Sequence, residues 1–595
     1  MSSTQIPDWP PSTASEQEQA DLLHSARDWA LSHALVYRPP LQSSVDTDTA
    51  FHTSVIHAPF ALYPSPFPRQ LFDLAVDIQT TYSELYARIS TDFDFLEQVI
   101  GGNVSKVDSF QGELWKIAKA VREEGLVQNI HLGLFRSDYL LHVTGPEGPL
   151  ELKQVEFNTI SSSFGALSNK VTDLHRYLAF TGAYPETSRP RITPNKLPHN
   201  VALRELARGL AEAHEAYGKS KTSKVLFVVQ DPERNAFDQR ALEYELLEKH
   251  GIYSTRRSFA QLHAEASLSS APTRELFLTS PSSPNTSTEI SVVYFRAGYT
   301  PSDYPTAVEW DTRTLIERSR AIKCPSVALQ LSGAKKVQQV LTEPGVLERF
   351  IADDEYRLEK DELVTTFMKL YPMDESPLGK EALKLAYSHP ERFVLKPQRE
   401  GGGNNIYKQD IPAFLDKLEK EDQEKLKQSA AHGNKKMHKV SKEPKSREAY
   451  ILMELIEPPA KCRNAMVRAN EAKPRIGDVV SELGIYGVCL YEDTSTPVRT
   501  PRASIDDSSE TSTNTNGAAA RPALIDVPEG RSTTPTLKHR ERELNGSIRS
   551  NKPNHSARIL RNKNAGHLLR TKGRESDEGG VAVGFSVIDS PLLID

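Results

Sequence analysis

The stretch FVLKPQREGGGNNIY, residues 393–407, places a lysine, a carboxylate and three consecutive glycines directly after a short apolar strand. Consecutive glycines let backbone amides approach an anion closely, Lys396 can neutralise phosphate charge, and Glu400 can hold a divalent cation against the same phosphates. The stretch matches neither the GxxxxGK(S/T) loop nor the GxGxxG fingerprint of common nucleotide-binding folds. A hairpin whose glycines only permit a tight turn is the alternative, but the flanking lysine and glutamate favour a phosphate site.

A second stretch, ELKQVEFNTISSSF at residues 151–164, alternates as a strand does and ends in a serine-rich turn. Because side chains two apart share a face of a strand, we expect Gln154, Glu156 and Asn158 on one face and the intervening residues on the other. Carboxylate and amide oxygens suit Mg²⁺, which prefers few protein ligands together with water and phosphate oxygens. An exposed polar strand face is the alternative. The serines that follow can hold a polar small molecule or form an ordinary loop.

The carboxyl end repeats this pattern in GHLLRTKGRESDEGGVAVGFSVID, residues 566–589. An apolar run leads to Arg570 and Lys572, then to an acidic turn with two glycines and a second apolar run, so we expect this end to pack into the core. A terminal hairpin without a catalytic role is the alternative. Arg136, in LFRSDY, can pair with a substrate carboxylate or with Asp138. Together these cations, carboxylates and glycines describe a site for a metal-bound polyphosphate beside an acidic substrate.

Composition excludes several classes of protein. The chain has 595 residues, 38% hydrophobic and 26% charged, which is enough for a large core. Its 73 Lys and Arg against 79 Asp and Glu give a net charge of −6, so no global field attracts a nucleic acid or an anionic membrane. The three cysteines are too scattered for a disulfide framework or a paired metal site. Without a long apolar run or a leader-like amino terminus, we expect a cytoplasmic protein that does not bind membranes or nucleic acids.

The order of predicted elements indicates an α/β fold. The first 150 residues are predicted as helix and loop, with amphipathic stretches at 71–100 and 111–124. Apolar residues recur at helical spacing in residues 201–218. Strands then alternate with helices over residues 222–325, which predicts a separate α/β module.

Two polar segments are predicted to be surface loops rather than core. Residues 419–447 are crowded with Lys and Glu, and residues 494–562 are rich in Ser, Thr, Asn and Arg. Such compositions bury too little apolar surface to order themselves. A nucleic-acid role for their basic residues is the less favoured alternative, because no aromatic residues are interleaved for base stacking.

The motifs, taken in chain order, resemble those of the eukaryotic glutathione synthetases, a branch of the ATP-grasp carboxylate-amine ligases. The resemblance rests on RSDY, VEFNTISSSFG, ERNAFDQR, YFRAGY, KCPSVALQLSGAKKVQQ, FVLKPQREGGGNNIY, YILMELIEP, SELGIYG and LLRTK with EGGVA. It implies an ATP-grasp catalytic lobe built from residues 1–221 and 326–595, with a glycine-rich lid. Residues 222–325 would form an inserted α/β substrate-binding domain, and 419–447 and 494–562 would be surface insertions.

The resemblance also implies an activity, which is the ATP-dependent joining of γ-glutamylcysteine to glycine, with an acyl phosphate intermediate, to give glutathione, ADP and phosphate. Mg²⁺ and a homodimer are implied as well. Mg²⁺ would be bound by Glu156, Asn158 and Glu400, and the catalytic cations would be Arg136, Lys396, Arg570 and Lys572. ATP contacts are implied for Glu156, Lys335, Lys396, Glu400, Gly401, Gly402, Gly403, Asn404, Asn405, Tyr407, Met453, Glu454, Leu455, Ile456, Glu482, Lys572 and Glu578. Substrate contacts are implied for Arg136, Ile160, Ser161, Ser162, Ser163, Glu233, Arg234, Asn235, Gln239, Arg296, Ala297, Gly298, Tyr299, Arg570, Val581 and Ala582.

Two other functions remain open at this point. One is a related ligase that uses another amine acceptor, such as β-alanine or serine, with Val581 and Ala582 deciding the choice. The other is a catalytically silent nucleotide-binding or scaffold protein of the same fold. Glu578 stands where many relatives of the family place Asp, and Leu455 stands where some place Lys.

Overall fold

The computed structural model describes most of the chain. The described residues are 6, 9–10, 15–40, 51, 53–145, 148–218, 222–351, 353–399, 403–431, 444–495, 556–576, 581, 584 and 586–595. Helices alternate with strands from several separate sheets, so the predicted mixed α/β class is confirmed.

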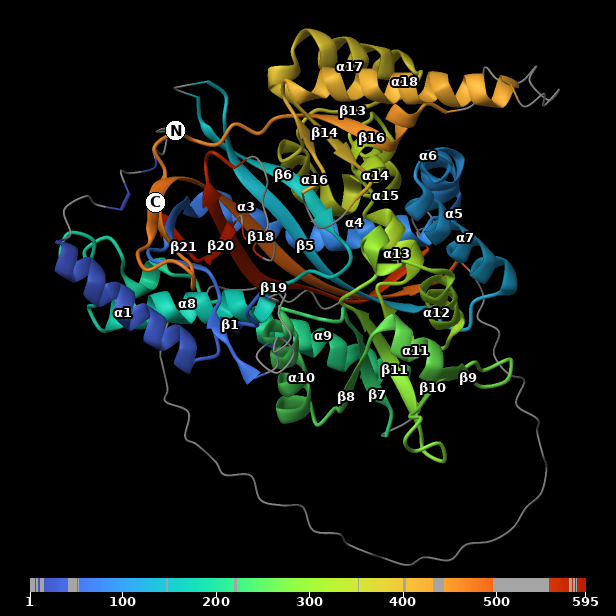
Figure 1. The fold of residues 1–595 in the computed structure, drawn as a ribbon, viewed down its shortest axis with the longest axis horizontal. Helices are drawn as coiled ribbons and strands as arrows, with labels where there is room; N and C mark the ends of the chain where they lie inside the picture. Colours follow the sequence, from blue (N-terminus) through green and yellow to red (C-terminus); the bar gives the residue numbers. More distant parts are fainter. Residues whose placement is uncertain are drawn as a thin grey trace, which may run out of the picture. The chain divides into compact units, whose positions relative to one another are not determined.

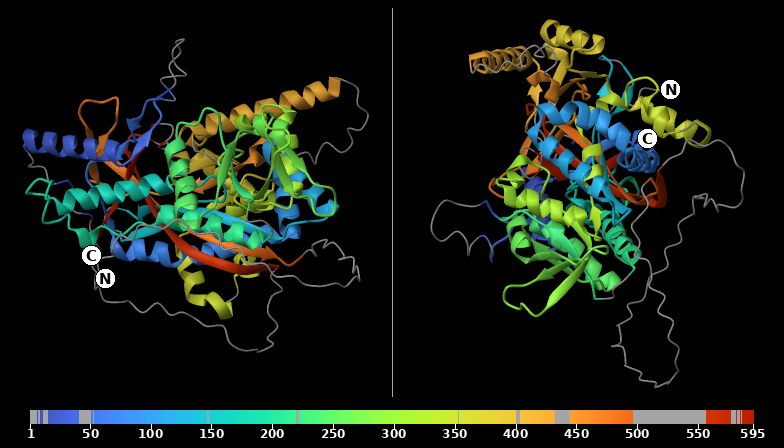
Figure 2. Two further views of the ribbon diagram at one scale, coloured as in Figure 1. Left: turned by 90° about the horizontal axis from the view of Figure 1, so that it is seen from below. Right: turned by 90° about the vertical axis from the view of Figure 1, so that its right-hand side faces the viewer.

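A seven-stranded sheet carries most of the core. Its two long central strands, β18 (Arg475–Asp493) and β19 (Ala557–Gly573), form an antiparallel pair that is seen side by side in all three views (Figures 1 and 2). The other strands are β5 (Ile130–Val143), β6 (Leu150–Asn158), β17 (Arg463–Val467), β3 (Phe60–Ala61) and β20 (Ser586–Asp589). The order across the sheet is β17-β3-β20-β19-β18-β5-β6, so segments near both ends of the chain meet in one sheet.

Helices cover both faces of this sheet because its strands bury apolar side chains on both. On β18, Ile485, Cys489 and Tyr491 belong to one core, and the alternate residues Tyr486, Val488 and Leu490 belong to the other. The first core is shared with α4 (Gln79–Thr91), and the second with α8 (Gly165–Phe180) and α9 (Ala202–Tyr217). A strand buried on both faces shows no alternation in its sequence.

The absence of alternation explains the main error in the predicted elements. The predicted amphipathic stretches are helical: α3 (Arg69–Asp77), α4, α5 (Phe93–Leu96), the π-helix Glu97–Val104 and α7 (Ser109–Glu124). The first 150 residues are not only helix and loop, however, because they also contain β5. Ten of the fourteen residues of β5 are buried, nine of them in a row, so its sequence lacked the period-two signal of a half-exposed strand.

The predicted module at 222–325 contains a six-stranded sheet with helices. The strand order is β8-β7-β11-β10-β9. The sixth strand, β12, pairs with residues 292–294 of β11, beyond the residues of β11 that pair with β10. The strands are β7 (Lys224–Val228), β8 (Ser254–Arg257), β9 (Ala266–Leu268), β10 (Leu276–Thr279), β11 (Ser287–Phe295) and β12 (Ile322–Cys324). The helices are α10 (Ala236–His250), α11 (Phe259–Glu265) and α12 (Ala307–Arg318).

A smaller antiparallel sheet has the order β13-β16-β14-β15. Its strands are β13 (Leu370–Pro372), β16 (Tyr450–Glu454), β14 (Phe393–Pro397) and β15 (Ile406–Tyr407). Helices α17 (Pro377–Ser388) and α18 (Asp410–Ala431) lie together along one side of it (Figure 1). Phe393 and Leu395 pack with these helices, whereas Val394 belongs to a separate apolar cluster on the opposite face.

The remaining elements include two short strand pairs and further helices. Strand β21 (Pro591–Ile594) pairs with β4 (Ser65–Pro68), and β1 (Val36–Tyr37) pairs with β2 (Ile56–His57). The other helices are α1 (Glu16–Ser32), α6 (Ser105–Val107), α13 (Val327–Ser332), α14 (Lys335–Val340), α15 (Val346–Phe350) and α16 (Asp353–Thr365). Within the described ranges, no helix is both long and apolar enough to cross a membrane.

The two predicted surface loops need correction. The segment 419–447 begins as helix, because α18 continues to Ala431; acidic and basic side chains along it contact one another, as Lys417 contacts Glu421 at 3.9 Å. The segment 494–562 ends in strand, because β19 begins at Ala557. Residues 432–443 and 496–555 lie outside the described residues.

Replacing residues 496–555 with a short turn should leave the fold intact. Asp493 pairs with Ala557, and the backbone N–H of Thr494 donates to the Ser556 carbonyl at 2.6 Å, so the two strands already meet where the segment departs. Shortening the connection also lowers the entropy cost of closing it. We expect the Tm to change by less than about 2 °C in a calorimetric scan. Tyr491→Ala in the same hairpin should lower the unfolding free energy by about 3 kcal/mol or more and so lower the Tm further. Equal Tm shifts from the two changes would contradict the prediction.

Candidate functional site

The three larger sheets meet around one cavity of about 690 Å³. β5, β6, β18 and β19 provide one wall, the small sheet provides a second, and the segments that follow β7 and β11 provide the third. Many residues singled out from the sequence line it, and these are Arg136, Glu156, Asn158, Ile160, Ser161, Ser163, Glu233, Asn235, Arg296, Tyr299, Lys335, Lys396, Asn404, Asn405, Tyr407, Met453, Glu454, Leu455, Ile456, Glu482, Arg570, Lys572 and Val581.

Other expected residues do not reach the cavity. They are Ser162, Arg234, Gln239, Ala297, Gly298 and Gly403. Ser162 is buried between the two serines that line the cavity, and Gln239 lies behind Glu233, to whose carboxylate it donates at 2.6 Å. Five further expected residues fall outside the described part of the chain: Glu400, Gly401, Gly402, Glu578 and Ala582.

A β-bulge in β6 changes which side chains face the cavity. Asp138 pairs with Glu156 and Tyr139 pairs with Gln154, so Val155 is an extra residue between the two pairs. The expectation that Gln154 shares a face with Glu156 and Asn158 is therefore wrong. Val155, Glu156 and Asn158 line the cavity, and Gln154 is buried away from it.

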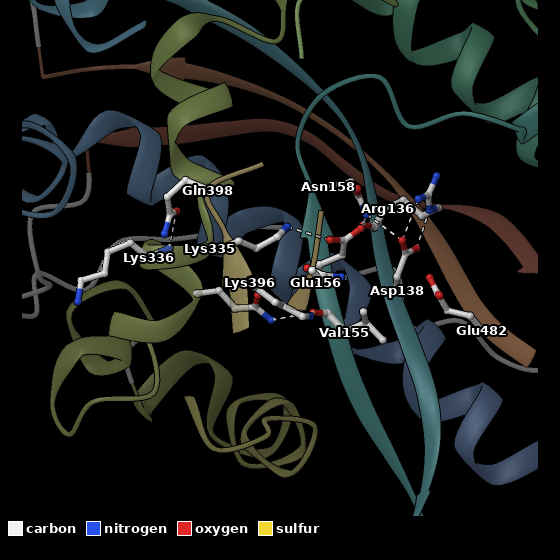
Figure 3. Close-up of polar contacts among 12 residues, drawn as sticks. Arg136, Asp138, Val155, Glu156, Asn158, Lys335, Lys336, Lys396, Gln398 and Glu482 are labelled. Atoms are coloured by element: carbon white, nitrogen blue, oxygen red, sulfur yellow. Dashed lines mark hydrogen bonds and ion pairs between the residues drawn. The ribbon is translucent and has the colours of Figure 1, made fainter. Parts of the chain in front are cut away.

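Two lysines surround Glu156 at one end of the cavity (Figure 3). The Nζ of Lys335, the first residue of α14, donates to Glu156 Oε2 at 2.8 Å, and the Nζ of Lys396 on β14 donates to the Val155 carbonyl at 3.1 Å. Burial alone would raise the pKa of Glu156, but the two lysines outweigh it and hold the pKa well below its usual range. This end therefore keeps an ionised carboxylate between cations.

Carboxylates and arginines alternate beside Glu156 on the same wall, where Asp138 pairs with Glu156. Arg136 donates twice to Asp138, at 2.6 and 2.8 Å, so the pairing with Asp138 is the one the structure contains. Arg570 donates to Asp138 at 2.9 Å and also to Glu482. Burial raises the pKa of Glu482. The Arg570 guanidinium opposes this shift, and the nearby carboxylates of Asp138 and Glu156 raise the pKa further. Asp138 was not among the predicted site residues, although its place two residues after Arg136 on a strand was the available signal.

Two aspartates, the buried Asp238 and the half-buried Asp303, hold the backbone of the third wall. Asp238 on α10 accepts the N–H groups of Phe164, Ala166 and Leu167 at 2.8 to 3.2 Å and so orders the start of α8 after the serine turn. Asp303 accepts the N–H groups of residues 298–300, also at 2.9 to 3.2 Å. Arg296 then donates to the Ser163 hydroxyl at 2.6 Å, which joins the two loops.

The small sheet contributes an apolar surface. Met453, Val394 and the partly buried Tyr407, Leu455 and Ile456 form one cluster beside the cavity. The N–H of Leu455 donates to the Arg392 carbonyl at 2.8 Å, which ties the end of β16 to the start of β14. A flat aromatic group fits such a surface, with backbone atoms available at its edge.

Further lining residues were not predicted, and several are cations beside the glycine-rich segments. Arg399 directly precedes Glu400 and contacts Asp108. Arg574 follows Lys572 by two residues and donates to the carbonyls of Pro458 and Pro459. Their position next to glycine-rich segments was a usable signal. The other additional lining residues are Leu140, Val155, Phe164, Gln230, Glu391, Val394, Pro397, Lys408, Glu457, Pro458, Val480 and Ser576.

The described residues contain no group of three or more His, Cys, Asp or Glu arranged to hold a metal ion. A Mg²⁺ ion needs fewer protein ligands when phosphate oxygens and water complete its shell. Glu156 and Asn158 satisfy this smaller requirement, since both line the cavity from β6. The amide nitrogen of Asn158 donates to the Asp138 carboxylate and the Arg136 carbonyl, so its oxygen is the atom suited to a cation.

The segments that line the cavity are also found in known proteins. A family model described as the ATP-binding domain of eukaryotic glutathione synthase matches residues 16–528 and 547–593. The chain belongs to the eukaryotic glutathione synthase family. The match includes segments from all three walls of the cavity.

Relatives of this glutathione synthase family member align over nearly their full length. The glutathione synthetase of Bos taurus is 35% identical over 580 residues, 97% of this chain and 98% of the bovine protein. The glutathione synthetase large chain of Schizosaccharomyces pombe is 37% identical over 491 residues, 79% of this chain and 89% of the yeast protein. A solved structure of a glutathione synthetase-like effector from Globodera pallida, 21% identical, has a TM-score of 0.63 over 98% of each chain and shows the same fold.

In this glutathione synthase family member, Asp303→Ala should loosen the loop at residues 298–300. The loss of one carboxylate removes three backbone hydrogen bonds at once, so amide hydrogen exchange of Tyr299 and its neighbours should accelerate by about tenfold or more. Mass spectrometry of peptic fragments measures this. Ser302→Ala is the matched control, because the Ser302 hydroxyl contacts the Thr300 side chain at 2.7 Å and should change exchange little. Unchanged exchange in Asp303→Ala would contradict the assigned role.

Proposed function

We propose that this chain joins γ-glutamylcysteine to glycine at the expense of ATP and releases glutathione, ADP and phosphate. The observation that carries the proposal is the single cavity in which three kinds of surface meet: lysines around Glu156, an apolar surface on the small sheet, and arginines with serine hydroxyls. Membership of the eukaryotic glutathione synthase family supports this reading.

The nucleotide is proposed to lie between the small sheet and the seven-stranded sheet, which together would form an ATP-grasp lobe. Its adenine would pack on Met453 and Ile456, and its phosphates would meet Lys335, Lys396 and Lys572. Mg²⁺ would be held by Glu156 and Asn158 and would supply charge neutralisation for the phosphoryl group in transfer. The lysines then offset the remaining phosphate charge.

The dipeptide is proposed to occupy the side of the cavity that the 222–325 module closes. The cations Arg136, Arg296 and Arg570 offer planar donors to carboxylates, and Ser161 and Ser163 offer hydroxyl and backbone groups. The cysteinyl carboxylate would attack the terminal phosphorus of ATP, forming an acyl phosphate as ADP leaves. The glycine amine would then attack the acyl carbon, lose a proton and expel phosphate.

Two further proposals concern the protein as a whole. We expect a homodimer, and sedimentation at twice the 66.4 kDa chain mass would support it. We also expect a cytoplasmic location, with the support that the thiols of Cys324, Cys462 and Cys489 are all free.

Purified protein with ATP, Mg²⁺, γ-glutamylcysteine and glycine should form a tripeptide with the mass of glutathione. Parallel reactions with β-alanine or serine in place of glycine test the acceptor, and ADP release is measured in each. Faster ADP release with β-alanine than with glycine would reject the proposed acceptor. No product with any acceptor would favour a silent nucleotide-binding protein.

Glu156→Gln should lower the rate of glutathione formation by about a hundredfold or more, because it removes an ionised oxygen donor from the phosphate end. Calorimetric titration of ATP with and without Mg²⁺ should show a smaller Mg²⁺ effect on affinity than in the parent protein. Glu151→Gln is the matched control: Glu151 lies on the same strand, pairs with Lys153 at 3.0 Å and does not line the cavity. Equal kinetics for the two variants would show that Glu156 has no special role.

A further inference from the structure

Asp138 lies behind the cavity wall and joins three side chains that line it. Its side chain is fully buried and accepts four N–H donors: Arg136 Nε at 2.6 Å, Arg136 Nη2 at 2.8 Å, Asn158 Nδ2 at 2.9 Å and Arg570 Nη2 at 2.9 Å. These partners come from β5, β6 and β19, so one carboxylate connects three strands. Figure 3 shows Arg136 and Asn158 converging on it.

Stability alone is a weak reason for this arrangement. Removing a carboxylate and two arginines from water is costly, and apolar side chains of similar volume often stabilise a fold as well or better. The bonds do, however, restrict each partner. Two of the Arg136 nitrogens are bound to Asp138, and a third, Nη1, lies 3.4 Å from the Ser163 carbonyl in the serine turn. The Asn158 amide nitrogen is also engaged, which orients its oxygen.

We propose that Asp138 is a positioning residue for the ligation, setting the mutual orientation of Arg136, Asn158 and Arg570. This inference rests on the proposed function, because it assigns Arg136 and Arg570 to the dipeptide and Asn158 to the cation. Asp138 itself touches no ligand in this scheme. It acts by binding both arginines to one carboxylate, while Glu482 on the neighbouring strand also binds Arg570.

The facing strand is shaped to leave room for this group. Gly484 on β18 pairs directly with Asp138, and a Cβ at Gly484 would lie 2.7 Å from Arg136 Cδ and 2.9 Å from Asp138 Oδ1. Contacts this short force a neighbour to move. A side chain at Gly484 would thus displace Arg136 without removing any charged group.

Asp138→Asn tests the proposal, since the amide offers one oxygen and turns an NH₂ group toward N–H donors. We expect the KM for γ-glutamylcysteine to rise at least about tenfold, the cost of one or more charge-assisted hydrogen bonds. The KM for ATP should rise less than the KM for the dipeptide, because Asn158 is the only partner of Asp138 assigned to the cation of the nucleotide and Lys335 and Lys396 take part in none of the four bonds. A merely structural role would lower kcat through loss of folded protein and leave both KM values unchanged.

Asp589→Asn is the matched control. Asp589 is buried in the same sheet, accepts the Ser65 and Thr571 hydroxyls at 2.6 Å each, and does not line the cavity. We expect both KM values of this variant to stay within about twofold of the parent.

Gly484→Ala covers the case in which Asp138→Asn fails to fold. It should raise the KM for the dipeptide in the same direction. If the parent makes glutathione but the dipeptide KM is unchanged in both variants, the positioning role is rejected while the proposed function stands. If the parent makes no glutathione, the proposed function fails, and the inference that rests on it falls as well.

Discussion

The register of β18 between β5 and β19 is the constraint on which the site depends. In this register Glu482 lies between Leu140 and Arg570, while Arg136 pairs with Asn158 on the next strand. Residues more than three hundred positions apart therefore become neighbours. A slip of one residue would turn every side chain of the strand to the opposite face, moving the charges into an apolar core. The two cores that enclose the sheet exclude such a slip.

Within this register, the neighbouring charges explain why the pKa values of two glutamates are shifted in opposite directions. Burial raises the pKa of both glutamates, but two lysines hold the pKa of Glu156 below its usual range, whereas burial and the nearby carboxylates leave the pKa of Glu482 raised. Both glutamates are partly buried, with 24% and 17% of the side chain exposed, so the difference arises from their neighbours rather than from exposure. The cavity therefore presents lysines beside arginines on one wall, and these suit the phosphates of a nucleotide and the carboxylates of a peptide.

The sequence was most informative where chemistry and local pattern coincide. Lys396, Asn404 and Tyr407 could be found because they flank consecutive glycines, and Arg570 because it follows an apolar run. The bulge at Val155 could not be foreseen, since it arises from pairing with β5, a strand whose two buried faces hide its periodicity. The role of Asp138 as a shared acceptor likewise depends on three strands meeting. These features belong to tertiary structure and leave no signal within one segment.

The cavity is walled by three sheets: the seven-stranded and six-stranded sheets share two large cores, whereas the small sheet has separate apolar clusters. A molecule that fills it touches strands from all three, so its binding free energy is added to the cost of separating any one of them. Occupancy thus works as a reversible cross-link. The liganded protein should melt as one cooperative body, with the small sheet gaining most because its own core is the smallest that borders the cavity.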